Sequence, residues 1–140
     1  MFRSSIFLAM GAAILLASAG CAGDKGPVSI ASVQLTKDDG QGGDGDVATG
    51  FHPNDGVIHC LATLNKIDSG SKIGLTMIAV DAGGAKNQKI VSTVVTTNGI
   101  TNTADGKFSL PRPWPLGKYQ CAVTLNGAPA KTVNFQVTGG

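Results

Sequence analysis

Four aspartates form the densest group of potential metal ligands in the chain. Asp38, Asp39, Asp44 and Asp46 lie in a Gly/Asp-rich segment over residues 38–50. Clustered carboxylates suit a hard cation such as Ca²⁺, which takes oxygen ligands. The spacing fits neither the EF-hand loop nor the Gly-Gly-x-Gly-x-Asp repeat of β-rolls, and the chain contains no Glu. We therefore expect a solvated loop, with a bound cation as the alternative and no metal ligand assigned.

The two histidines are the other candidate metal ligands. His52 and His59, together with Met77, carry the imidazole and thioether groups that suit copper. Strand alternation predicts that Met77 points inward and His59 outward, so the three side chains would not converge. We expect His59 to be a surface histidine, and the sequence predicts no cofactor.

No pattern in the chain predicts a catalytic nucleophile. A nucleophilic side chain needs an adjacent, oriented base, and no serine lies in a nucleophile elbow. Because Glu is absent, any acid–base carboxylate would have to be Asp, and the nine Asp lie almost wholly in predicted turns. We expect no enzymatic activity.

The composition predicts a small, mostly β domain. The 140 residues are 42% hydrophobic but only 5% aromatic, so aliphatic side chains must build the core. The abundance of Thr, Val and Gly favours strands and turns over helices. The formal net charge of +2 and the lack of a basic cluster argue against a nucleic-acid partner.

The first 20 residues have the layout of an export signal. Arg3 supplies a positive region, residues 6–16 are apolar, and small residues lead to Cys21. The apolar segment is too short to span a bilayer as a mature helix. Two cleavage sites compete. Ala17-Ser18-Ala19 fits ordinary signal peptidase, whereas Ser18-Ala19-Gly20-Cys21 resembles a bacterial lipobox, with Ser18 where Leu is commonest.

The rest of the chain alternates apolar and polar residues in short segments separated by turn residues, as β-strands do. We expect strands at residues 29–36, 57–64, 72–80, 89–97, 108–110, 118–125 and 133–137. The residues predicted to face inward in the first two are Ala31, Val33, Leu35, Ile58, Cys60, Ala62 and Leu64. A break in alternation at Val94-Val95 suggests either a bulge or an edge contact there, and residues 98–106 suggest a polar loop.

From residue 29 onward the chain resembles secreted bacterial immunoglobulin-like modules. The resemblance rests on residues 51–55, 108–110, 114–119, 125–127 and 131–137. It implies an all-β, immunoglobulin-like antiparallel β-sandwich of about seven or eight strands over residues 28–140, after a cleaved N-terminal signal helix. Members of this family often have a Trp-Tyr pair in the third strand, where this chain has Met77-Ile78.

The resemblance also implies structural roles for residues near one end of the sandwich. A Tyr two residues before a Cys is the layout of a tyrosine corner, so Tyr119 would form the corner and Cys121 would pair with Cys60 across the two sheets. Gly117 would supply a permissive backbone at the turn. Independently of the resemblance, we expect Trp114, the sole Trp, to fold back over the open end and Phe51 to close the sandwich edge. The alternative for Trp114 is an exposed ring that stacks on a sugar or anchors a partner.

If Cys60 pairs with Cys121, Cys21 is the cysteine left over, at the position where a lipidated Cys belongs. The alternative of two buried free thiols is rare in exported proteins. We therefore expect cleavage after residue 20, a lipid on Cys21 and a short tether over residues 21–27. Ala22, rather than Asp, after the Cys resembles the outer-membrane default of lipoproteins.

These expectations combine into a non-catalytic, lipid-anchored envelope lipoprotein that is a protein-binding or structural module. Its partners would be a membrane, through the lipid on Cys21, and a protein of the cell envelope. The alternatives are a free periplasmic or secreted protein that binds a ligand or metal, and an enzyme inhibitor that acts through its loops.

Overall fold

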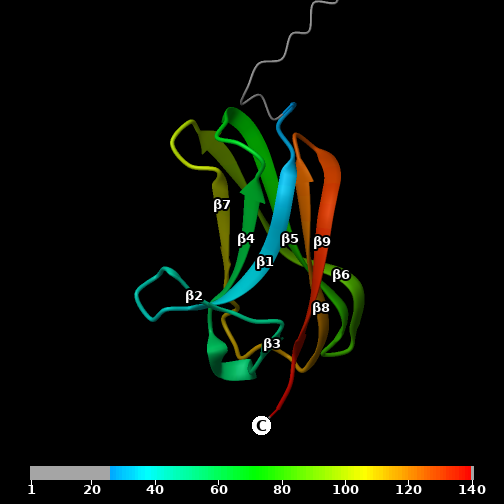
Figure 1. Ribbon diagram of the computed structural model, residues 1–140. Helices are drawn as coiled ribbons and strands as arrows, with labels where there is room; N and C mark the ends of the chain where they lie inside the picture. Colours follow the sequence, from blue (N-terminus) through cyan, green and yellow to red (C-terminus); the bar gives the residue numbers. More distant parts are fainter. Residues whose placement is uncertain (1–25, 140) are drawn as a thin grey trace, which may run out of the picture.

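The alternating segments form two β-sheets packed face to face in the computed structural model, which describes residues 26–139 (Figure 1). One sheet has the strand order β2-β1-β4-β7, and the other has the order β3-β9-β8-β5-β6. The strands are β1 (Ile30–Asp38), β2 (Asp44–Val47), β3 (Gly50–Phe51), β4 (Ile58–Leu64), β5 (Ser69–Ala82), β6 (Ala85–Asn98), β7 (Thr103–Phe108), β8 (Gly117–Leu125) and β9 (Ala128–Val137). A short 3-10 helix, η1 (Pro53–Asp55), follows β3. Neighbouring strands pair antiparallel, apart from the parallel pair of β3 and β9.

The predicted signal segment, Cys21 and most of the tether lie outside the described residues. Over residues 26–139, no helix is long and apolar enough to cross a membrane.

The core lies between the two sheets and is built from alternate residues of each strand. In β4, Ile58, Cys60, Ala62 and Leu64 are buried as predicted. In β5, alternate residues from Ile73 to Ala79 are buried, and the residues between them are half-buried. Full burial of one aliphatic side chain stabilises a fold by roughly 1.5–3 kcal/mol, so this aliphatic layer is the main source of stability.

The first strand departs from the predicted alternation. The prediction for Ala31 is wrong, because this residue is exposed, and Val33 is only half-buried. The pairing of β1 with β4 is irregular between Ile30 and Ser32. This irregularity places the larger Ile30 in the core and turns Ala31 to solvent.

Of the two explanations for the break at Val94-Val95, the bulge is wrong, because these residues pair in regular register with Gly74 and Ile73. Strand β6 lies at the edge of its sheet, as the second explanation requires. The β5–β6 register shifts at Ile90 instead, between the residues that pair with Met77 and Ile78, and a second shift lies between the residues that pair with Ser69 and Lys72.

The predicted polar loop over residues 98–106 is also wrong in part, because it contains most of β7. Ala104, Gly106 and Phe108 alternate inward in this strand. A Cβ at Gly106 would lie 3.3 Å from Leu75 Cβ, so the absence of a side chain lets the two sheets approach closely here.

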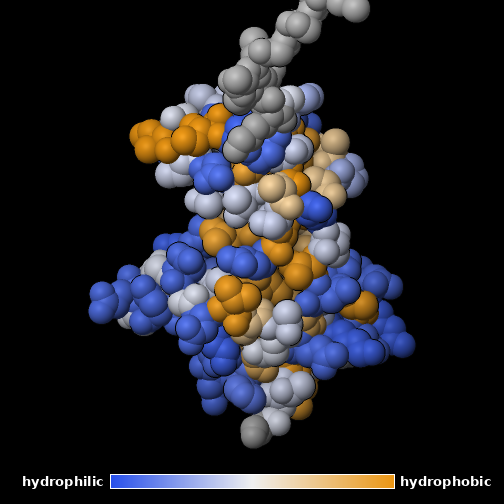
Figure 2. All heavy atoms as spheres, viewed as in Figure 1, coloured by the Kyte–Doolittle hydropathy of each residue, from blue (hydrophilic) through white to orange (hydrophobic). Residues whose placement is uncertain are grey.

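The two long margins of the sandwich differ. On one margin, β1 contacts β9, and Figure 2 shows a narrow apolar strip along the centre of this view with hydrophilic residues on both sides in the lower half. On the other margin, β6 contacts β7. The C-terminal end of the described chain lies at the same end of the sandwich as β3 and η1 (Figure 1).

Candidate functional site

The predicted disulfide joins Cys60 of β4 to Cys121 of β8 and so connects the two sheets. The two Cα atoms are 6.7 Å apart, and both residues are fully buried. Each cysteine faces inward because it lies in phase with the buried positions of its strand. This bond uses two of the three cysteines in the sequence.

Trp114 closes one end of the sandwich. It is 1% exposed, and its Nε1 donates a hydrogen bond to the carbonyl of Gly56 over 2.7 Å. The indole packs edge-on against Tyr119, with ring centroids 5.7 Å apart. Tyr119 in turn stacks on Phe135, and Phe51 packs edge-on against Phe135. The four rings form one buried aromatic cluster, so the indole face of Trp114 is not available to stack on a sugar ligand.

The turn before β8 is fixed by Tyr119 and Gly117. The Tyr119 hydroxyl donates to the carbonyl of Pro115 over 2.6 Å, and burial raises the pKa of this phenol. Gly117 has φ of 143°, and a Cβ there would lie 2.2 Å from the carbonyl oxygen of Asp81. Only glycine therefore fits at this position without a shift of the backbone.

His59 is not the surface residue that alternation predicted. Its side chain does point away from the disulfide, but it is fully buried. His59 Nε2 lies 2.9 Å from Asp38 Oδ1, and His59 Nδ1 lies 3.0 Å from Asp105 Oδ1. The carboxylates of Asp38, at the end of β1, and Asp105, in β7, thus hold the imidazole on this face of the four-stranded sheet.

The two carboxylates favour the protonated imidazolium of His59. With both ring nitrogens protonated, each donates to one carboxylate, whereas a neutral ring would turn a lone pair toward one of them. Burial alone lowers the pKa of His59, but the hydrogen bonds and charges of Asp38 and Asp105 outweigh it, so the net pKa is raised. The hydrogen bond from His59, helped by the Gly40 N–H, lowers the pKa of Asp38.

These directions predict a pH dependence of stability. The raised pKa of His59 stabilises the fold fully below the ordinary histidine pKa of about 6.5, and this contribution is lost as pH rises through the folded-state pKa. The lowered pKa of Asp38 stabilises the fold above its ordinary value of 3.8, and this contribution is lost as pH falls through the folded-state pKa. We expect the contribution of the cluster to be greatest between about pH 4 and 6.5.

Urea denaturation at a series of pH values checks this prediction. Asp105→Asn should lower the free energy of unfolding near pH 6 and should flatten its decline at higher pH. Asp46→Asn removes an exposed carboxylate of β2 and is the matched control. An identical pH profile in wild type and Asp105→Asn would show that the ion pairs do not affect folding.

The Asp-rich segment uses two of its carboxylates to bind its own backbone. Asp38 Oδ2 accepts from the Gly40 N–H, and Asp39 Oδ1 accepts from the N–H groups of Gln41 and Gly43. Part of the predicted loop forms β2, which carries the exposed Asp44 and Asp46. Within residues 26–139, no group of three or more His, Cys or Asp side chains is arranged to hold a metal ion.

The three residues considered for copper lie apart. Met77 is fully buried in β5. His52 precedes η1 on the surface, and its Nδ1 lies 3.0 Å from the carbonyl oxygen of Thr138. His59 is enclosed by the two carboxylates.

A hollow of about 650 Å³ lies on the outer face of the five-stranded sheet, beside β3. Its outward side chains come from three strands, from the β2–β3 connection and from the segment after β9, namely Thr49, Val80, Lys118, Asn134, Gln136 and Thr138. These groups supply two amides, hydroxyls and one ammonium, which suit hydrogen bonding to a polar ligand or to an extended peptide. The hollow is therefore a candidate binding surface for a polar ligand or peptide.

The sequence did not predict the hollow, because the hollow depends on β3, which pairs parallel with the end of β9 and places Gly50 beside Gln136. A two-residue strand gives no periodic signal. The sequence also did not predict the partners of His59, because Asp105 lay in a segment predicted to be a loop.

No protein-family model matches the chain, and no curated protein matches its sequence. Its structure is similar to that of an immunoglobulin-like protein from Pseudomonas aeruginosa, with a TM-score of 0.55 and 12% identity over 83% of this chain and 100% of that one. The fold is immunoglobulin-like. The predicted fold class is therefore confirmed.

A second similar structure is an alkylpurine DNA glycosylase from Pseudomonas fluorescens, bound to DNA containing an abasic site analog. The TM-score is 0.50 and the identity 15%, over 84% of this chain but only 32% of the glycosylase. At 12% and 15% identity, both likenesses concern the fold alone.

Proposed function

We propose that this chain is a non-catalytic, lipid-anchored module of the bacterial cell envelope that binds a protein partner or has a structural role. The observation that carries the proposal is the Cys60–Cys121 disulfide. Disulfides form and persist in exported proteins and are rare in the cytosol. Because the bond uses two of the three cysteines, Cys21 is the one left for modification.

The surroundings of Cys21 support a lipid at this position. It follows an apolar segment and the small residues Ser18, Ala19 and Gly20, a pattern that resembles a lipobox. The first strand begins at Ile30, so the tether between lipid and domain is short. An acyl chain contributes about 0.8 kcal/mol of membrane affinity for each buried CH₂, and more than one chain is needed for stable anchoring.

A binding or structural role is supported by the way the polar residues are used. The imidazole of His59 and the carboxylates of Asp38 and Asp39 are engaged in hydrogen bonds within the domain. Immunoglobulin-like folds commonly serve as structural or binding modules. The hollow that includes Lys118, Asn134 and Gln136 is the surface that we assign to a partner.

Membrane fractionation of the full chain in a two-membrane bacterium tests the anchor. Wild type should sediment with the outer membrane, and Cys21→Ala should appear in the soluble periplasmic fraction or remain unprocessed. Ala22→Asp is the matched control: it keeps Cys21 and should shift the protein to the inner membrane. Wild type that is wholly soluble, or Cys21→Ala that still fractionates with the outer membrane, would contradict the proposal.

A further inference from the structure

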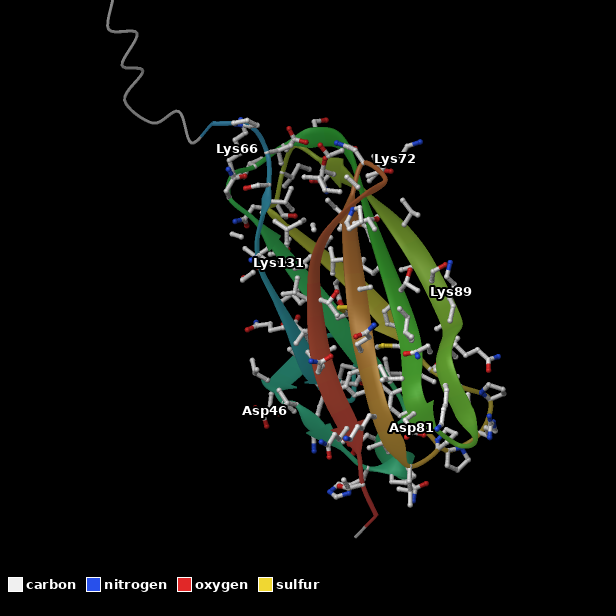
Figure 3. The ribbon with its side chains drawn as sticks, turned by 90° about the vertical axis from the view of Figure 1, so that its right-hand side faces the viewer. Asp46, Lys66, Lys72, Asp81, Lys89 and Lys131 are labelled. Carbon is white, nitrogen blue, oxygen red and sulfur yellow. A yellow bond between two sulfur atoms is a disulfide. The ribbon has the colours of Figure 1, made fainter. Side chains whose placement is uncertain are left out.

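The five-stranded sheet ends at β6, a strand of 14 residues whose strand partner is β5. Figure 3 shows β6 along the outer margin of this sheet, with Lys89 on it and no strand beyond it. Strand β7 contacts β6 but belongs to the other sheet, where it pairs with β4. One side of β6 therefore presents backbone N–H and C=O groups that no strand of residues 26–139 pairs.

The other strand edges of the described chain carry features that block pairing with a further strand. Strand β1 pairs with β2 only at Thr36 and Asp38, and the rest of that edge is short and irregular between Ile30 and Ser32. Strand β3 has two residues, and β2 has four with two aspartates. Strand β7 carries Asp105 and Lys107. The edge of β9 carries Pro129 and Lys131 and an irregular register beside them. Short length, charge, proline and bulges are the usual protections of an edge strand.

Strand β6 has the charged protections over its first half only, and its second half carries one register irregularity, between Thr96 and Asn98. Lys86, Lys89 and the irregularity at Ile90 lie in the half that follows the β5–β6 turn. Residues 91–98, by contrast, have the sequence Val-Ser-Thr-Val-Val-Thr-Thr-Asn, without charge, proline or glycine. Val94 in this half is 62% exposed. An uncharged β-branched edge of this kind is competent to accept another strand.

We propose that residues 91–97 of β6 pair antiparallel with the same residues of a second copy of this chain, centred on Val94. The pairing would join the two five-stranded sheets into one continuous sheet about a twofold axis normal to it. This interface is additional to the proposed function and does not depend on the lipid.

The pattern of charges favours a second copy and fixes the register. With Val94 opposite Val94 of the partner copy, Lys89 falls opposite Gly99, beyond the end of the partner strand. Lys89 of each copy therefore lies outside the paired segment, away from Lys86 and Lys89 of the other copy. A register shifted toward the start of β6 would instead bring Lys86 and Lys89 of both copies together, which like-charge repulsion disfavours.

The side chains of this register match on both faces of the sheet. On the outer face, Ser92 lies opposite Thr96 on either side of the central valine pair. On the inner face, Thr93 lies opposite Val95. Pairs of β-branched residues directly opposite each other stabilise antiparallel sheets. The interface is smaller than that of a stable dimer, so a covalent trap is the suitable assay.

Disulfide trapping of the full chain tests the proposal. Residues directly opposite across an antiparallel pair have Cβ atoms about 4.5–5.5 Å apart, close enough for a disulfide after a small adjustment. Val94→Cys, purified and mildly oxidised, should migrate at twice the chain mass on a non-reducing gel. Mass spectrometry should find a peptide in which the substituted position 94 of one copy is disulfide-linked to the same position of the other.

The matched control for the trap is Val47→Cys. Val47 is also a valine, is also 62% exposed, and lies on the edge strand β2 of the other sheet. This variant should remain at the chain mass under the same oxidation.

A second variant pair tests the register without a cysteine. Val94→Lys places two lysines opposite each other. With a chemical cross-linker that does not react with amines, this variant should give no cross-linked dimer, whereas Val47→Lys should give as much as wild type. Equal yields of disulfide-linked dimer from Val94→Cys and Val47→Cys would overturn the proposal, and so would the absence of dimer from both variants. Cross-linking of the Val94→Cys thiol to a different protein in place of a second copy would also overturn it.

Discussion

Replacing Trp114 with alanine is expected to lower the free energy of unfolding by about 3–5 kcal/mol, the usual cost of deleting a large buried aromatic side chain. The indole is 1% exposed and packs on Tyr119, and its Nε1 satisfies the carbonyl of Gly56. Since whole domains are stable by about 5–15 kcal/mol, this one substitution should leave the fold marginal. Urea denaturation followed by far-ultraviolet circular dichroism measures the effect.

Two control variants make the Trp114 result interpretable. Leu116→Ala truncates a nearby side chain that is 55% exposed, and its effect should stay within about 0.5 kcal/mol. Trp114→Phe keeps an aromatic ring but removes the donor, and its cost should lie between those of the other two. Equal stability of Trp114→Ala and Leu116→Ala would show that Trp114 does not close the end of the sandwich.

Loss of the disulfide is the second large effect. The bond closes a loop of 61 residues, and the chain-entropy model gives about 4 kcal/mol of stabilisation for such a loop. Cys60→Ala combined with Cys121→Ala should lower the urea midpoint strongly, and reductant added to wild type should give a similar shift. Cys21→Ala, compared as soluble protein, should leave the midpoint unchanged. An unchanged wild-type midpoint in reductant would contradict the prediction.

The strands that line the core could be predicted because their burial is one-sided. In β8, Tyr119, Cys121 and Val123 are buried while Lys118 and Gln120 face outward, so period-two alternation suffices. The roles predicted for Trp114 and Gly117 rest instead on their place in the proline-rich turn before β8. Nothing in their own periodicity predicts a buried indole or a backbone with positive φ.

The errors arise where a distant segment changes the environment of a strand. Alternation gave the correct face for His59 but could not show that Asp38 and Asp105 enclose it, because both come from other strands. Strand β7 was missed because Thr103 and Asp105 are polar. Their strand conformation follows from pairing with Thr63 and Leu61 of β4.

The proposed dimer and the proposed anchor place a joint constraint on the assembly. A twofold axis normal to the sheet sends the two N-terminal ends in opposite directions. The tether of residues 21–27 spans about 24 Å when fully extended. Both lipids can then reach one membrane when the dimer lies with a sheet face along it, which puts the axis normal to the membrane.

Intact-mass measurement of the mature protein tests the central claim most directly. If Cys21 is lipidated, full-length wild type extracted from membranes should lack residues 1–20, begin at Cys21 and carry the added mass of a diacylglyceryl group. Cys21→Ala should lack that mass. The Cys60–Cys121 bond should be present in both proteins. A mature wild-type chain that begins at Gly20, or at Cys21 with an unmodified thiol, would contradict the account.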